Sequence, residues 1–227
     1  MSELESTEEA PERAWRERAV SRSLNAARSR AEVRVQRFLD AAFELIDEKG
    51  TTEFTIQEVI ERSKQSLRAF YQHFDGKDEL LLALFEETVR EAGEDLETVA
   101  SSDDPPMERL HAFTIRLHEW CDPSDKPRKR GTHNRRPIME FSVTLAVEYA
   151  DRVKEAMAPI SRMMVTLVTE ANNAGAIEVD DPRQTAWLVQ QLVMHTWFAN
   201  RLVDTARARM DPETVWNFCR RGLNATD

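Results

Sequence analysis

The side chains best suited to specific chemistry gather in one segment, between Thr55 and Glu87. Within it, Arg68 and Gln72 are four residues apart, so they share a face if the segment is helical. A guanidinium group and a side-chain amide form paired hydrogen bonds with the edges of guanine and adenine in the major groove. We therefore expect Arg68 and Gln72 to contact bases, the alternative being a solvated helix surface.

Other polar side chains around this pair suit the phosphate backbone. The phenol of Tyr71, the imidazole of His73 and the ammonium of Lys77 are all hydrogen-bond donors. Tyr71 equally suits a half-buried packing position. Thr55 is expected to cap a helix first and to meet phosphate second. The predicted DNA contacts are Thr55, Ser66, Leu67, Arg68, Tyr71, Gln72, His73 and Lys77.

Sequence signals for two helices lie before Arg68. Apolar residues recur at helical spacing over residues 32–49, and Gly50 is placed to end that helix. Thr55 and Glu58 form a capping-box pattern, in which each side chain satisfies a backbone donor of the other residue. The sequence therefore predicts one longer helix followed by a short one.

The next two helices are also marked by their starts. Ser66 is a suitable N-cap for a short helix over residues 67–74, with Phe70 and Phe74 on one face. The run DGKDE then ends that helix and starts a much longer one, with acidic residues near its positive end. The resulting order of helices is typical of a helix-turn-helix module.

Residues 32–87 resemble the N-terminal domain of the TetR (tetracycline-repressor-like) family. The most specific shared string is FYQHFDGKDELL, from Phe70 to Leu81. The resemblance implies that the 67–74 helix enters the major groove as one reader of a dimer. It also implies a larger helical C-terminal domain for dimerisation and, usually, a small-molecule inducer. The other residues that carry it are Phe43, Leu45, Ile46, Gly50, Thr55, Val59, Ile60 and Ser66.

Two stretches depart from the family pattern. Ser63, Lys64 and Gln65 stand where the family usually has Ala-Gly-Val, so a left-handed turn position becomes doubtful without its glycine. Arg68 and Ala69 replace a small Gly-Thr pair. Base preference therefore cannot be transferred from the family.

The composition favours a helical protein. Of 227 residues only six are glycine, and the formal net charge is -10. The sequence has no apolar run long enough for a membrane span and no signal-peptide pattern at its start. The two cysteines, Cys121 and Cys219, are expected to be reduced thiols. We expect an all-α cytoplasmic protein that makes no membrane contact.

Charge is segregated at the N-terminus. Residues 1–12 contain five glutamates and no basic side chain. Residues 13–37 contain eight arginines and only two glutamates. Such a block is either a solvated arm or a segment that lies along phosphates. The predicted domains are a flexible extension over 1–30, a helix-turn-helix domain over 31–78, and a ligand-binding and dimerisation domain over 79–227.

The C-terminal part is rich in aromatic residues and methionine, most of which are expected in the core. Relatives of this kind hold an apolar pocket, so some of these side chains should line one. His195 is the polar residue expected to orient a ligand. The predicted ligand-binding residues are Phe113, Leu117, Trp120, Met139, Met163 and His195.

A basic loop and a set of histidine and cysteine residues are the remaining features that could bind a ligand or a metal. The basic loop over residues 126–136 is expected to be solvated, with capture of an anionic ligand such as an acyl thioester as the alternative. His111, His118 and Cys121 are seven and three residues apart, without the tight spacing of a zinc site. We therefore predict no metal, no cofactor and no catalytic site.

Assembly is predicted from the last two helices. The segment 182–206 is apolar almost all round, so it needs cover on more than one side. A homodimer through residues 182–223 would supply that cover. The sequence thus predicts a dimeric repressor that binds a roughly palindromic operator in double-stranded DNA and is released by a small, largely apolar ligand. The alternatives are a ligand-independent dimeric DNA-binding protein and a helical enzyme that retains the fold.

Overall fold

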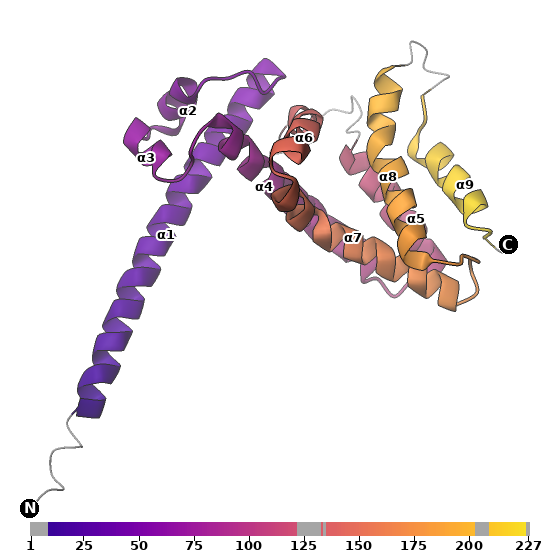
Figure 1. Ribbon diagram of the computed structural model, residues 1–227, viewed down its shortest axis with the longest axis horizontal. Helices are drawn as coiled ribbons and strands as arrows, with labels where there is room; N and C mark the ends of the chain where they lie inside the picture. Colours follow the sequence, from indigo (N-terminus) through magenta and orange to yellow (C-terminus); the bar gives the residue numbers. More distant parts are fainter. Residues whose placement is uncertain (1–8, 122–132, 134, 203–208, 226–227) are drawn as a thin grey trace, which may run out of the picture.

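The computed structural model describes residues 9–121, 133, 135–202 and 209–225, and all regular structure within them is helical (Figure 1). This confirms the predicted all-α fold. The helices are α1 (Glu9–Lys49), α2 (Ile56–Ser63), α3 (Leu67–Tyr71), α4 (Lys77–Ala100), α5 (Pro106–Cys121), α6 (Arg136–Glu148), α7 (Ala150–Asn173), α8 (Pro182–Arg201) and α9 (Pro212–Gly222). None of the helices in these described ranges is both long and apolar enough to cross a membrane.

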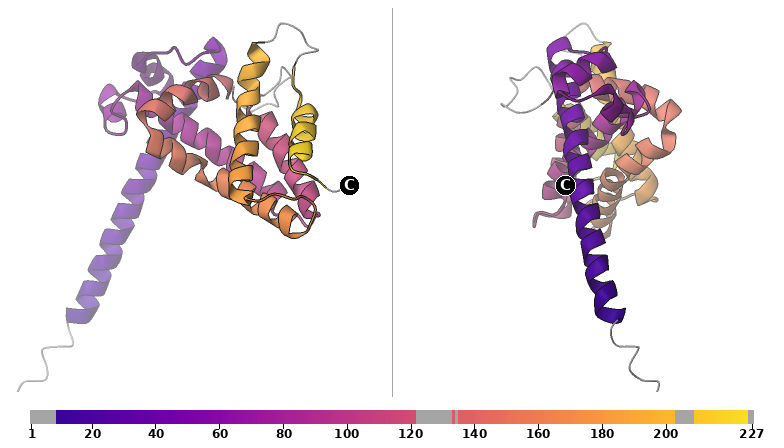
Figure 2. Two further views of the ribbon diagram at one scale, coloured as in Figure 1. Left: turned by 45° about the vertical axis from the view of Figure 1, so that its right-hand side comes forward. Right: turned by 90° about the vertical axis from the view of Figure 1, so that its left-hand side faces the viewer.

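Helix α1 begins much earlier than the sequence pattern indicates. The expected start lies near Glu32, but the helix begins at Glu9 and stands clear of the other helices as a rod (Figures 1 and 2). Alanine, arginine and leucine sustain it by their helix propensity. Arg28 and Glu32 add an ion pair of 2.8 Å one turn apart. The apolar periodicity of the sequence does not indicate the part of α1 before Glu32, because that part packs no apolar face against the other described helices.

The N-terminal domain forms around three phenylalanines. Phe38 of α1 meets the rings of Phe70 and Phe74 edge-on, with centroids 5.5 and 6.0 Å apart. All three side chains are buried. Arg62 of α2 binds Glu48 of α1 through two hydrogen bonds of 2.8 and 2.7 Å. Helices α1, α2 and α3 therefore hold one another in a fixed arrangement.

The turn between α2 and α3 keeps its left-handed residue without glycine. Lys64 takes up that conformation, with φ 56° and ψ 34°, and its N–H bonds back to the carbonyl of Ile60. A non-glycine residue bears a cost of roughly 1–2 kcal/mol there. The doubt raised by the missing glycine is thus resolved, because the packing of α2 and α3 fixes the turn. Helix α3 is shorter than expected and ends at Tyr71.

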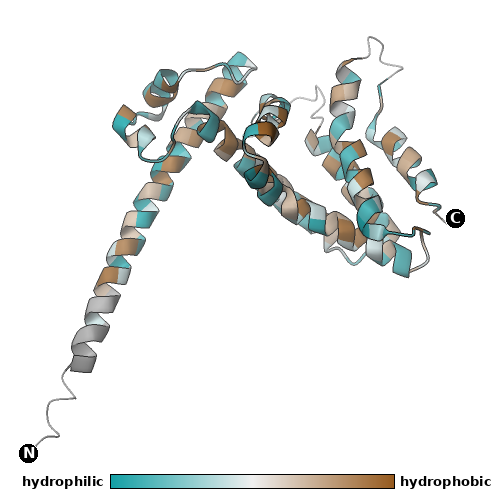
Figure 3. Ribbon diagram, viewed as in Figure 1, coloured by the Kyte–Doolittle hydropathy of each residue, from teal (hydrophilic) through white to brown (hydrophobic). Residues whose placement is uncertain are grey.

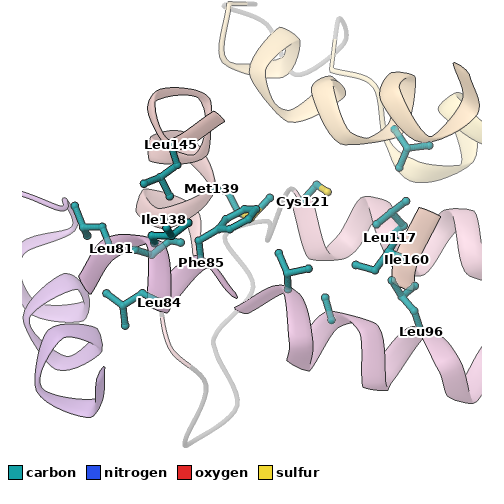
Figure 4. Close-up of a cluster of buried hydrophobic side chains, with 14 of the residues drawn as sticks. Leu81, Leu84, Phe85, Leu96, Leu117, Cys121, Ile138, Met139, Leu145 and Ile160 are labelled. Carbon is teal, nitrogen blue, oxygen red and sulfur yellow. The ribbon is translucent and has the colours of Figure 1, made fainter. Parts of the chain in front are cut away.

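Helix α4 joins the two domains. It packs against α1 on one side and against α5, α6 and α7 on the other. Leu80, Leu81, Leu82, Leu84 and Phe85 at its start are all buried, because both domains cover them. Figure 4 shows how Leu81 and Phe85 meet Ile138, Met139 and Leu145 from α6. A shift of α4 would therefore move the N-terminal domain relative to the rest.

Candidate nucleic-acid interface and effector cavity

Helix α3 has one buried face and one open face. Phe70 is fully buried on the inner side, whereas Leu67 and Tyr71 are 50% and 54% exposed. Arg68 and Gln72 are also exposed and lie on the outer side. The structure therefore brings four of the predicted DNA-contacting residues to one surface with no protein covering it among the described residues.

The starts of α2 and α3 are capped by side chains. The Thr55 hydroxyl accepts a hydrogen bond of 3.2 Å from the Glu58 N–H, and the Glu58 carboxylate accepts one of 2.8 Å from the Thr55 N–H. The Ser66 hydroxyl accepts a hydrogen bond of 3.1 Å from the Ala69 N–H. These caps satisfy backbone donors in the first turns of α2 and α3 and so mark where each helix begins.

Glu58 is also bound by Lys49 at 2.7 Å, and this contact ties α2 to the end of α1. The hydrogen bond from Lys49, together with the one from the Thr55 backbone, lowers the pKa of Glu58 to about 2. The carboxylate therefore keeps its charge, and α2 keeps its capping box, throughout the neutral and mildly acidic range.

The remaining predicted phosphate contacts lie at the edge of this surface. Lys77 is partly buried, with its ammonium 5.1 Å from the centroid of the Phe54 ring. The Nε2 atom of His73 is buried and has no hydrogen-bond partner among the described residues. In this arrangement that nitrogen points into the domain, so only another ring orientation would offer it to a phosphate.

The C-terminal domain contains a small apolar cavity between α4, α5, α6, α7 and α8. Its volume is about 20 Å³, room for roughly one water molecule. Three of the lining residues are methionines, whose flexible side chains adapt readily to a guest. The lining consists of Thr88, Val89, Ala92, Leu117, Trp120, Cys121, Met139, Met157, Ile160 and Met194.

The predicted ligand-binding residues lie in four different places. Leu117, Trp120 and Met139 line the cavity. Phe113 is fully buried elsewhere in the core, and Met163 lines an open groove of about 780 Å³ between α4 and α7. His195 is exposed, and its Nδ1 lies 2.9 Å from the Gln191 carbonyl of its own helix. The structure does not bring His195 to the cavity.

Met157 and Met194 line the cavity although they were not among the predicted residues. They come from α7 and α8, which pack against each other. Met194 precedes His195, and adjacent residues of a helix point about 100° apart. The rotation of α8 therefore turns Met194 inward and His195 outward, and the composition of the sequence carried no signal for that rotation.

Two residues just before α6 contact different parts of the molecule. The guanidinium of Arg135 lies on the ring of Trp120 in the cavity wall, 3.8 Å from the centroid. His133 stacks on Phe43 of α1 at 4.7 Å, and its Nδ1 lies 2.9 Å from an Asp47 oxygen. Arg135 therefore meets the cavity wall, and His133 meets α1. The rest of the predicted basic loop, apart from Arg136, lies outside the described residues.

Helices α8 and α9 carry several large apolar side chains that are exposed to solvent. Figure 3 colours segments of both helices as hydrophobic. Leu188 and Leu192 lie one turn apart on α8, 58% and 38% exposed. His195 falls on the same side, three residues beyond Leu192. The other large members of this set, the α8–α9 face, are Trp187, Phe198, Leu202 and Phe218. Exposed apolar side chains gathered on neighbouring helices are a feature of many interaction sites.

The amino-acid sequence matches a known family over its N-terminal domain. Residues 38–84 match the model for bacterial regulatory proteins of the tetR family. The HTH-type transcriptional regulator BetI of Brucella anthropi is 30% identical over 81 residues. That match covers 36% of this chain and 42% of the relative, so the similarity spans less than half of the length of the relative.

Solved structures of the same family share the fold over most of the chain. A tetR-family transcriptional regulator from Pectobacterium atrosepticum aligns with a TM-score of 0.69 and 18% identity, over 88% of this chain and 98% of that one. The transcriptional regulator FadR from Bacillus subtilis, solved with stearoyl-CoA, aligns with a TM-score of 0.60 and 16% identity, over 83% of this chain and 97% of that one. At these identities the likeness establishes the fold.

Proposed function

We infer that this chain, which has the DNA-binding domain and the fold of the TetR family, is a transcriptional regulator that reads operator DNA through α3. The observation that carries this inference is the open face of α3, with Arg68 and Gln72 exposed above a buried Phe70. The packing of Phe70 against Phe38 and Phe74 fixes the orientation of this face. As a regulator of chromosomal genes, the protein would act in the cytoplasm.

We propose that two copies associate through the α8–α9 face. Each copy would cover the exposed leucines and aromatic rings of the other, and the same patch would serve both subunits. Two α3 helices would then enter successive major grooves of a roughly palindromic operator. The side chains proposed for this interface fall within residues 182–223, the range predicted from the sequence.

We also propose that a small, largely apolar ligand enters the methionine-lined cavity and releases the protein from its operator. A cavity of about 20 Å³ is too small for such a ligand, so methionine side chains and Trp120 must move. Trp120 would carry Arg135 and His133 with it and change the position of α1. The charged groove between α4 and α7 shares Val89 with the cavity and provides a route of access.

The reading function is tested on an operator isolated from a random duplex library by the purified chain. Replacing Arg68 with alanine is expected to cost about 1–3 kcal/mol at one base position and to relax specificity there. Replacing Lys77 with alanine is the control and should weaken all sequences equally. The measurement is a titration against single-base operator variants. An Arg68→Ala protein with the base preferences of the parent would contradict the assignment.

The path from the cavity to α1 is tested with stearoyl-CoA and a panel of uncharged apolar compounds. A compound that binds the native state raises the melting temperature and, in the parent, should weaken operator binding by roughly 5- to 150-fold. In His133→Ala the same compound should still raise the melting temperature but lose most of its effect on DNA. An unchanged effect on DNA would show that the signal takes another path.

A further inference from the structure

The N-terminal extension of α1, residues 9–37, is an element that the helix-turn-helix domain does not need for its core. That core begins at Phe38, the first fully buried side chain of the helix. At 1.5 Å per residue the extension is about 40 Å long. It leaves the molecule on the side of α2 and α3, away from α5, α8 and α9, in Figure 1 and in the left view of Figure 2.

The extension concentrates positive charge in an acidic protein. Residues 13–37 contain eight arginines and two glutamates, against a net charge of -10 for the whole chain. Arg30, Arg34 and Arg37 are all exposed and recur at helical spacing, so they form one basic stripe. Arg28 is occupied by its ion pair with Glu32. The stripe presents a surface complementary to an anionic partner.

The stripe is joined rigidly to the proposed reading surface. Arg37 adjoins Phe38, whose ring contacts Phe70 of α3 at 5.5 Å. The ion pair between Arg62 and Glu48 fixes α2 to the same helix at 2.7 Å. Once α3 lies in a major groove, the course of the extension past the duplex is therefore determined.

We propose that the extension is a second DNA-binding element, which lies along the sugar–phosphate backbone beside the half-site and neutralises phosphates without reading bases. The proposal rests on the proposed function, because α3 must first place the extension near DNA. It goes beyond that function by adding contacts outside the bases that α3 reads. Regular helix lets the arginines meet successive phosphates without the ordering cost of a flexible arm.

A second copy of the extension fits the observations less well than DNA. Val20 and Leu24 are exposed and share a face with Ala27 and Ala31, which would be the surface for helix pairing. Alanine offers little apolar area to bury. Two extensions side by side would also bring the same positive charge together, which is unfavourable.

The experiment compares the full-length parent with the triple variant Arg30→Gln, Arg34→Gln, Arg37→Gln. Its control, Arg116→Gln, Lys154→Gln, Arg162→Gln, removes the same charge from exposed sites on α5 and α7. Each protein is titrated against two forms of the isolated operator. One is trimmed to the half-sites, and the other carries about 12 flanking base pairs on each side. At about 3.4 Å per base pair each flank spans about 40 Å, the length of the extension. Titrations are repeated over a range of salt concentrations, and sedimentation is measured in parallel.

The parent should gain affinity from the flanks, and the triple variant should not. In the triple variant the plot of log affinity against log salt should become less steep, by up to about 0.9 for each arginine removed from each subunit. Binding should weaken by on the order of 10-fold or more near 0.1 M salt, with base preferences unchanged. The control should match the parent in slope and in its response to the flanks.

An unchanged slope and flank response in the triple variant would overturn the proposal. Dissociation of the dimer in that variant would overturn it in favour of a role in assembly. Failure of the proposed function itself would look different, because the parent would then bind no duplex with sequence preference.

Discussion

Replacing Leu192 with glutamate is expected to convert the protein into monomers and to lower operator affinity by at least about 100-fold. Leu192 lies within the α8–α9 face, beside Leu188 and His195. In a dimer the new carboxylate would be buried without a partner, which costs several kcal/mol per subunit. Two linked readers gain roughly 10²- to 10⁴-fold in affinity from their connection, and monomers lose that gain.

The matched control is Val147→Glu on α6. Val147 is 82% exposed, so it is as open to solvent as any residue of the α8–α9 face but lies outside it. This variant should remain dimeric and bind operator like the parent. Sedimentation at micromolar concentration and circular dichroism make the comparison. A Leu192→Glu protein that stays dimeric, or a monomeric parent, would show that the α8–α9 face is not the interface.

Replacing Phe70 with alanine is expected to unfold the N-terminal domain and abolish DNA binding while the C-terminal domain stays folded. The Phe70 side chain is fully buried, with ring centroids 5.5 Å from Phe38 and 5.3 Å from Phe74. Truncation of a core phenylalanine costs about 3–5 kcal/mol. That is a large part of the stability of a domain of this size. Hydrogen exchange should show lost protection in α2, α3 and the end of α1, and retained protection in α5, α7 and α8.

Tyr71→Ala provides the control for that experiment. Tyr71 meets the Phe70 ring edge-on at 5.5 Å, but its own side chain is 54% exposed. Its loss should leave the domain folded and remove at most one phosphate contact. Parent-like protection in Phe70→Ala would mean that the three-phenylalanine cluster does not hold the domain together.

The fold of the N-terminal domain was largely predictable because its signals are local. The capping box of Thr55 and Glu58 and the cap at Ser66 each act within three residues. Such contacts form in the helix that contains them and need no distant partner. The pattern of Phe70 and Phe74 likewise implied which side of α3 is buried. The sequence alone therefore indicated which side chains α3 leaves exposed to solvent.

Other features depended on neighbours far along the chain. Lys64 adopts the left-handed conformation because packed helices on both sides impose the turn, although its residue type disfavours it. The sequence pattern does not indicate the early start of α1, because a helix without a buried face has no apolar periodicity.

What the sequence determined by itself was the all-α fold, the starts of α2 and α3 and the outward-facing residues of α3, since these follow from short-range hydrogen bonds and periodicity. Only the tertiary structure decided which residues share the cavity. A helix that is apolar almost all round, such as α8, does not reveal its own rotation. The packing of α8 against α7 turns Met194 toward the cavity that Trp120 also lines and leaves His195 exposed to solvent. The contact of Arg135 with Trp120 and of His133 with Phe43 was equally hidden, because residues so far apart in the chain are brought together only by the packed fold.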